Sequence, residues 1–267
     1  MRGFSVYCSS AGIAEMEKKD KSMGNLWNFF YVLAASVGGG VIQTTTGFGY
    51  GIFVMLFFPL FLPLLQASAL SSMIGMWLSA TLAWRYRKHA DYRSLWLPVA
   101  VYMVVSTLCI TWSTRVNMGG LKAYFGLFLI LVAVYFIFFS KRIHLRANAG
   151  SATVCSTLSG AASGFFGIGG PPMVLYYLAV AGEDKLKYLG SLQMFFLFTG
   201  ISNIVSRAAN GIITKEVLLL AIPGLIGQII GKSIGLKIID RINIEQLKRV
   251  IYFFLAVAGA LTFFTNI

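Results

Sequence analysis

Residues 47–51 read Gly-Phe-Gly-Tyr-Gly and interrupt a stretch, 22–84, that contains no charged residue. A second interruption, Gly-Ile-Gly-Gly-Pro-Pro at 167–172, repeats glycines 120 positions after those at 47 and 49. Glycine and proline disfavour regular helix, and a broken helix in lipid is tolerated only inside protein or beside a cavity. Two breaks at matching places in two halves are typical of a transporter binding site.

The composition indicates a polytopic membrane protein. The chain is 57% hydrophobic and 12% charged, with a mean hydropathy of +0.77, whereas soluble domains carry roughly 25% charged residues. The formal net charge is +13. In a membrane protein such an excess of Lys and Arg usually lies in cytoplasmic loops that face anionic lipid. We expect membrane lipid as a partner and no nucleic acid, because no soluble domain is left to carry a basic face.

The charge-free runs predict an all-α fold of ten apolar segments, five in each half. A spanning helix needs about 20 residues, and the segments beside each glycine break are either full crossings or shorter re-entrant hairpins. The predicted helices lie at about 28–46, 50–65, 67–84, 95–113 and 119–139, and at about 151–167, 170–182, 187–206, 216–238 and 247–265.

The two halves are also related outside the breaks. The segment 115–122 resembles 241–248, 126 positions later, with Arg, Asn, Leu and Lys in register. Because each half has an odd number of segments, the second half crosses the membrane in the opposite direction to the first. This predicts an inverted-topology repeat, with the two broken helices near the midplane. The expected divisions are a poorly ordered N-terminal tail at 1–24, a first repeat at 25–140, a cytoplasmic linker at 141–150 and a second repeat at 151–267.

The distribution of Lys and Arg predicts the orientation. The loops at 85–93, 141–146, 185–187 and 237–249 are rich in these residues and are expected in the cytoplasm, which places both termini outside. Arg207 then ends a helix on the outer side, where it is a candidate for attracting an anion to the outer mouth. Lys232 is expected to extend its ammonium group to the inner surface, and attraction of an anion to the inner mouth is its alternative role.

No Asp or Glu lies deep in an apolar segment. Intramembrane carboxylates are the usual parts of a proton relay, so a carboxylate-based proton cycle is disfavoured. The three cysteines share no metal-like spacing, and no nucleophile–base constellation is present. We therefore expect no metal, no cofactor and no enzymatic activity.

The breaks themselves predict an anion pocket. A helix that begins after a glycine turn presents free N–H groups and the positive end of its dipole, and proline suits its first turn. Close packing by small residues is the alternative interpretation, and it is preferred for the stripe of Gly227, Gly231 and Gly235. The candidate substrate-binding residues are Gln43, Thr44, Thr45, Thr46, Gly47, Gly49, Tyr50, Gly51, Gly167, Gly169, Gly170, Pro171, Ser191 and Gln193.

Other polar residues at depth are weaker candidates for the pocket. These are Ser71, Ser72, Asn203 and Gln228. Hydrogen bonding between helices is the alternative role for each of them.

These motifs resemble the sulfite exporter TauE/SafE family of membrane permeases. The residues that carry the resemblance are the break at 47–51, the central basic loop, Gly-Phe-Phe-Gly-Ile-Gly-Gly-Pro-Pro at 164–172 and Gly-Ser-Leu-Gln at 190–193, and it covers nearly all of the chain after Asn25. It implies transport of a small sulfur-containing anion such as sulfite or a sulfonate, most readily in a bacterial or archaeal inner membrane. The first break lacks the proline pair, which makes the two half-sites inequivalent.

The sequence as a whole predicts alternating access at a site between the two repeats, with a small anion as substrate. A gated anion channel with re-entrant hairpins and a non-transporting membrane assembly subunit remain alternatives. Sodium held by carbonyl groups would serve as a coupling ion, although uniport suits the missing carboxylates better. An oligomer is compatible with the sequence.

Overall fold

The computed structural model describes residues 7–115 and 146–241, together with Asn243, Gln246, Arg249 and Phe253, and gives side chains from Trp27 onward. All regular structure in these residues is helical. The predicted helix at 119–139, the first half of the predicted linker at 141–150 and, apart from Arg249 and Phe253, the predicted helix at 247–265 lie outside the described residues.

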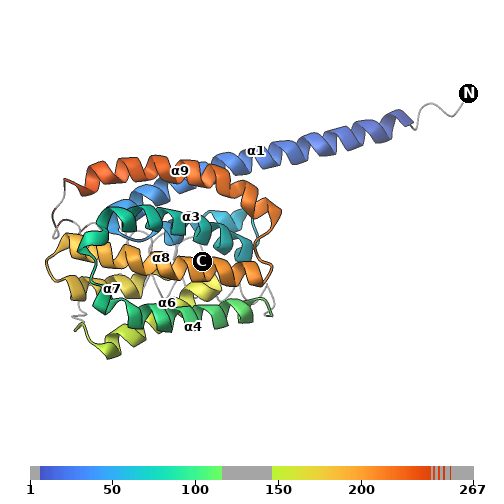
Figure 1. Cartoon of the computed structure of the whole chain (residues 1–267). Helices are drawn as coiled ribbons and strands as arrows, with labels where there is room; N and C mark the ends of the chain where they lie inside the picture. Colours follow the sequence, from blue (N-terminus) through green and yellow to red (C-terminus); the bar gives the residue numbers. More distant parts are fainter. Residues whose placement is uncertain are drawn as a thin grey trace, which may run out of the picture.

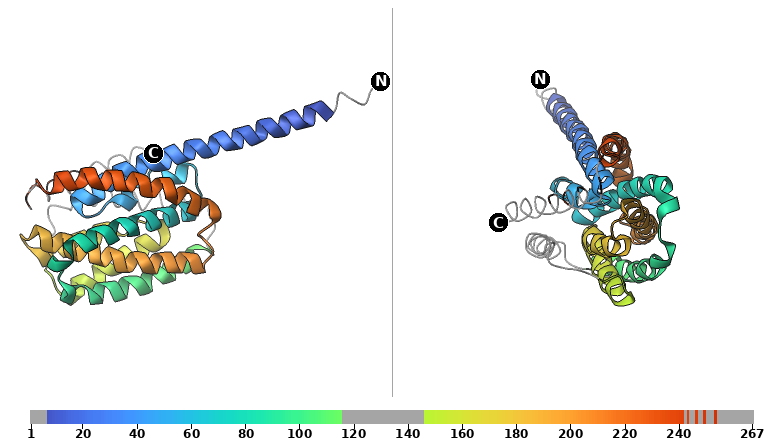
Figure 2. Two further views of the ribbon diagram at one scale, coloured as in Figure 1. Left: turned by 45° about the horizontal axis from the view of Figure 1, so that its top comes forward. Right: turned by 90° about the vertical axis from the view of Figure 1, so that its left-hand side faces the viewer.

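The first part of the chain contains α1 (Tyr7–Thr46), α2 (Tyr50–Val54), α3 (Leu64–Tyr86) and α4 (Trp96–Ser113), with the short 3-10 helices η1 (Phe58–Leu60), η2 (Arg87–His89) and η3 (Tyr92–Ser94) between them. The second part contains α6 (Ala149–Phe166), α7 (Gly170–Ala181), α8 (Lys185–Ala209) and α9 (Lys215–Ile239). In the right-hand view of Figure 2 most of the long helices are seen nearly end-on, so they run roughly along one axis.

Three described segments are long and apolar enough to cross a membrane: Tyr92–Ser113, Lys185–Ala209 and Lys215–Ile239. Two shorter apolar helical segments, Tyr50–Leu60 and Gly170–Ala181, follow the two breaks. On α9 the apolar side chains of Ile222, Ile226 and Ile230 are all exposed, which is typical of a helix that faces lipid. The expectation of an all-helical membrane protein is therefore confirmed.

Side-chain caps set the helix starts in the second half. The side chain of Asn148 accepts a hydrogen bond from the Ser151 N–H at 2.8 Å, and Ser151 reciprocates at the Asn148 N–H, which is a capping box at the start of α6. Asp184 and Thr214 accept backbone N–H groups at the starts of α8 and α9.

Two sequence predictions about helix bounds are wrong. The predicted helix at 50–65 ends after Val54, because Pro59 lies in the first turn of η1 and Pro63 is the N-cap of α3. The predicted helix at about 28–46 begins earlier, at Tyr7, and α1 extends beyond the bundle there (Figure 1). Its cluster at 15–21 is rich in Glu and Lys, which are good helix formers.

The helices pair closely through glycines. The main partners are α1 with α9, α4 with α6 and α3 with α8. A methyl group added at Gly227 would overlap the Leu33 carbonyl oxygen, and one at Gly231 would overlap that of Val37, so both glycines let α9 lie directly on the backbone of α1. The interpretation of this stripe as packing is therefore supported by the contacts it makes.

Gly231→Ala tests this packing. The added methyl group has only backbone in front of it, so α1 and α9 must separate, and overpacking of this kind destabilises by about 1–3 kcal/mol. We expect a clearly lower midpoint of thermal unfolding in detergent, while Ile230→Val, on the exposed face of the same helix, leaves it nearly unchanged. Equal midpoints for Gly231→Ala and the wild-type protein would contradict the close approach of the two helices.

Candidate functional site

A cavity of about 90 Å³ lies between the two glycine breaks. This volume is well above the roughly 10–15 Å³ that one water molecule requires. Its walls also include the middle of α3, at 71–79, and the middle of α8, at 196–203. The lining residues are Gln43, Gly49, Tyr50, Gly51, Ile52, Ser71, Ser72, Gly75, Met76, Ser79, Tyr102, Ser163, Gly167, Ile168, Gly169, Gly170, Phe196, Thr199, Gly200 and Asn203.

Both breaks begin with a glycine in the left-handed backbone region. Gly47 has φ 85° and Gly167 has φ 72°, a conformation that costs other residues free energy and commonly ends a helix. Their N–H groups still bond back into the preceding helix, to Gln43 O at 2.8 Å and to Ser163 O at 2.9 Å. The chain then leaves the helix and starts a new one three residues later, at Tyr50 and at Gly170.

The two breaks touch each other. A methyl group on Gly51 would lie 2.9 Å from the Gly167 carbonyl oxygen, and one on Gly170 would lie 3.2 Å from the Phe48 ring. At Gly169 it would lie 2.8 Å from the Ser159 carbonyl oxygen and 2.9 Å from the Tyr102 hydroxyl. Glycine is therefore required for space at Gly51 and Gly169, and at Gly170 the Phe48 ring would have to shift slightly to admit a side chain.

Some lining residues carry backbone N–H groups that have no helical acceptor. The first intrahelical bond of α2 runs from Phe53 N to Gly49 O at 3.0 Å, so the N–H groups of the three preceding residues have no acceptor within the helix. In α7 two prolines follow Gly170, and they contribute no N–H group. The first break therefore offers more backbone donors than the second.

Two amide side chains orient hydroxyl groups around the cavity. Gln43 Nε2 donates to Ser79 Oγ at 2.8 Å, and Asn203 Nδ2 donates to Tyr102 OH at 3.1 Å and to Ser163 Oγ at 3.0 Å. Each hydroxyl oxygen thus accepts a hydrogen bond from an amide, and each hydroxyl group keeps a hydrogen with which it can donate. None of the lining residues is charged, so the polar groups of the cavity wall are neutral.

The predicted site residues divide into two groups. The cavity is lined by Gln43, Gly49, Tyr50, Gly51, Gly167, Gly169 and Gly170, and it is not lined by Thr44, Thr45, Thr46, Gly47, Pro171, Ser191 or Gln193. The hydroxyl groups of Thr45 and Thr46 donate to carbonyl groups one turn back in α1, which is a common fate of threonine within a helix.

Gln193 supports the first break from outside the cavity. Its Nε2 donates to Gly47 O at 2.5 Å, and Tyr188 OH donates to Thr46 O at 2.9 Å. Both donors come from α8. They satisfy carbonyl groups that the end of α1 leaves without helical partners, so their role is to hold the break in shape.

Four polar lining residues were not singled out from the sequence: Ser79, Tyr102, Ser163 and Thr199. Three weaker candidates, Ser71, Ser72 and Asn203, do line the cavity, whereas Gln228 does not. The sequence carries little signal for the missed residues, because single hydroxyl groups in apolar helices most often bond to their own backbone.

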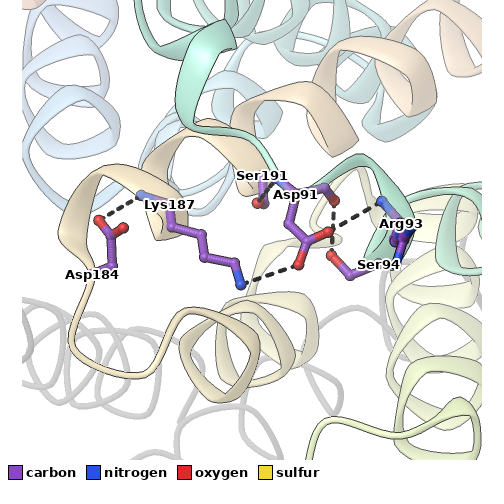
Figure 3. A network of polar contacts seen from close by, with 6 residues as sticks. All are labelled: Asp91, Arg93, Ser94, Asp184, Lys187 and Ser191. Atoms are coloured by element: carbon purple, nitrogen blue, oxygen red, sulfur yellow. Dashed lines mark hydrogen bonds and ion pairs between the residues drawn. The ribbon is translucent and has the colours of Figure 1, made fainter.

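Ser191 belongs to a polar network at one end of the bundle (Figure 3). Its Oγ accepts a hydrogen bond from the Asp91 N–H at 2.9 Å, and the Asp91 carboxylate pairs with Lys187 Nζ at 3.1 Å. Nearby, Arg85 pairs with Asp240 at 3.0 Å. These contacts join three of the loops that the sequence predicts on the cytoplasmic side.

Residues 32–262 match a family model described as Sulfite exporter TauE/SafE. This range includes both breaks and every residue that lines the cavity. The chain belongs to the sulfite exporter TauE/SafE family. Membership identifies a membrane transporter and not an enzyme, and it implies transport of sulfur anions such as sulfite. A search of the curated proteins and a search of the solved structures each found no match.

The Asp91–Lys187 pair gives this TauE/SafE protein a defined acid dependence. Burial alone would raise the pKa of Asp91, but the hydrogen bond and charge of Lys187, with backbone N–H groups of Ser94 and Arg93, lower it overall. A carboxyl whose folded pKa lies below its unfolded value, about 3.9, stabilises the fold above that pH and loses this contribution as the pH falls through the folded pKa.

We therefore expect the wild-type protein to melt at a higher temperature than Asp91→Asn at pH 6, and the difference to shrink as the pH falls below about 4. The measurement is thermal unfolding of both proteins in detergent between pH 6 and pH 3. The other carboxyl groups titrate in both proteins and cancel in the difference. A difference that stays constant to pH 3 would show that Asp91 does not contribute through its charge.

Proposed function

We propose that this protein moves a small sulfur oxyanion across the membrane by alternating access, with the anion held in the cavity between the two breaks. The observation that carries this proposal is a cavity lined by neutral hydrogen-bond donors and free of carboxylates. Oxygen atoms of sulfite or a sulfonate accept hydrogen bonds from hydroxyl and backbone N–H groups, and a carboxylate in the same cavity would repel them.

The position of the cavity supports alternating access. The residues that α3 and α8 contribute lie near the middle of each helix, which is where transporters hold their substrates. At the end of the bundle that carries the Asp91–Lys187 pair, the loop after α3 packs tightly on α8: a methyl group on Gly190 would lie 2.8 Å from Tyr86 O. This loop would close the cytoplasmic side in the described conformation.

An inverted repeat is supported by the helix pairing. The helix that leads into the first break, α1, packs on α9, and the one that leads into the second, α6, packs on α4. Each thus pairs with the fourth helix of the opposite half. The left-handed glycines Gly47 and Gly167 occupy equivalent positions, so we propose that two related halves enclose the site, with the basic loops inside and both termini outside.

The absence of a carboxylate in the cavity favours uniport over proton coupling. A carrier and a gated channel would use the same donors, so the distinction between them is kinetic. A carrier saturates and exchanges substrate across the membrane, whereas a channel passes a current that grows with the driving force.

The test is sulfite counterflow in proteoliposomes, with and without imposed pH and sodium gradients. We expect saturable counterflow that is independent of both gradients. Single-channel current without counterflow would support the channel, and the lack of any sulfur-anion flux from folded protein would contradict the proposal.

Ser79→Ala and Tyr102→Phe test whether the cavity binds the anion, because each variant removes one hydroxyl group from the cavity wall. A hydrogen bond to a charged group contributes about 1.5–3 kcal/mol, so we expect the half-saturating sulfite concentration to rise about tenfold or more. The control is Ser156→Ala, which removes an equally buried hydroxyl that donates to Ala152 O in α6 and does not line the cavity. Equal effects of control and cavity variants would count against this site.

A further inference from the structure

Arg207 is a fully buried cation beside the second break. Its side chain is 0% exposed, although the sequence suggested a place at the outer mouth; that expectation is wrong, because the residue points into the bundle. It lies one helical turn after Asn203 on α8, and Asn203 lines the cavity. Residues four apart share a helix face, so the guanidinium group lies just behind the cavity wall.

The partners of Arg207 are all neutral. Its Nη1 donates to Ser68 Oγ at 2.5 Å and its Nη2 donates to Ser163 O at 2.8 Å, while its Nε has no hydrogen-bond partner. The ion pairs found in the described part of the chain join Arg85 to Asp240 and Lys187 to Asp91, and neither includes Arg207. Among the described residues, no carboxylate therefore offsets its charge, and only the partial negative charge at the C-terminal ends of α6 and α8 lies beside it.

A charge buried in this way is costly unless something offsets it. Capping the end of α6 does not by itself require a cation, because Ser163 O already accepts the Gly167 N–H at 2.9 Å, and at the first break the neutral side chains of Tyr188 and Gln193 donate to the carbonyl groups of Thr46 and Gly47. The two breaks thus differ in one respect that packing does not explain: the second has a permanent positive charge beside it. An anion in the cavity would offset that charge.

We propose that Arg207 is the specificity-determining residue that makes the cavity prefer doubly charged anions over singly charged ones. This inference rests on the proposed function and adds the charge class of the substrate. Arg207 acts through the field of its charge and stays behind Asn203 and Ser163. A unit charge about 10 Å away, at an effective dielectric constant of about 20, changes affinity about tenfold for each unit of charge on the ligand.

The experiment compares sulfite, at a pH where it is mostly doubly charged, with methanesulfonate, which carries one charge. The quantity is the ratio of the concentrations at which each unlabelled anion halves the counterflow of labelled sulfite. In Arg207→Gln we expect the preference for sulfite to fall about tenfold. It should persist in Arg207→Lys, which keeps the charge, and in Lys215→Gln, which removes an exposed cation from the start of α9.

A second pair of variants keeps the test decisive if Arg207→Gln does not fold. Ser68→Asp places a carboxylate against Arg207 and neutralises it, while Ser68→Asn has the same size without the charge. We expect the sulfite preference to fall in Ser68→Asp and to persist in Ser68→Asn. A merely structural Arg207 would change stability or total flux in these variants and leave the ratio between the two anions unchanged.

The outcomes separate the two proposals. Suppose that the wild-type protein exchanges sulfite and that folded Arg207→Gln keeps the wild-type ratio, or that Ser68→Asp has the same ratio as Ser68→Asn. The role of Arg207 is then refuted, and the proposed transport stands. If the wild-type protein exchanges neither anion, the proposed function fails and this inference fails with it.

Discussion

Backbone groups at the two breaks must find partners inside the protein, because lipid offers none. One helix supplies side-chain donors at both breaks. Tyr188 and Gln193 donate to carbonyl groups at the first break, and Arg207 donates to one at the second. All three belong to α8, which lies among the other helices of the bundle (Figure 1). A shift of α8 would therefore disturb both breaks together, which couples the two halves of the site.

The same helix supplies Thr199, Gly200 and Asn203 to the cavity between those two supports. The support for the backbone and the recognition of the ligand thus lie on consecutive turns of α8. In the proposed function, this arrangement lets neutral side chains line a site for an anion. Backbone N–H groups, oriented hydroxyl groups and one buried charge behind the wall supply the attraction, and no carboxylate opposes it.

The sequence predicted the parts of this account that depend on local chemistry. Helix ends at the two glycine breaks follow from residue type alone, and so does the helical membrane class. The threonines show the limit: Thr45 and Thr46 look like donors in the sequence, but a helix lets them bond to their own backbone. Tyr102 and Arg207 could not be placed, because their positions depend on contacts with residues 101 and 44 positions away in the sequence.

The central claim is that the anion occupies the cavity between the breaks and reaches it from both sides of the membrane. The most direct test replaces Ser72, which lines the cavity, by cysteine in a protein lacking its own cysteines. A membrane-impermeant thiol reagent is then added to either side of proteoliposomes, with and without sulfite. The account predicts labelling from each side and protection by sulfite. Labelling that sulfite leaves unchanged, in protein that still exchanges sulfite, would contradict it.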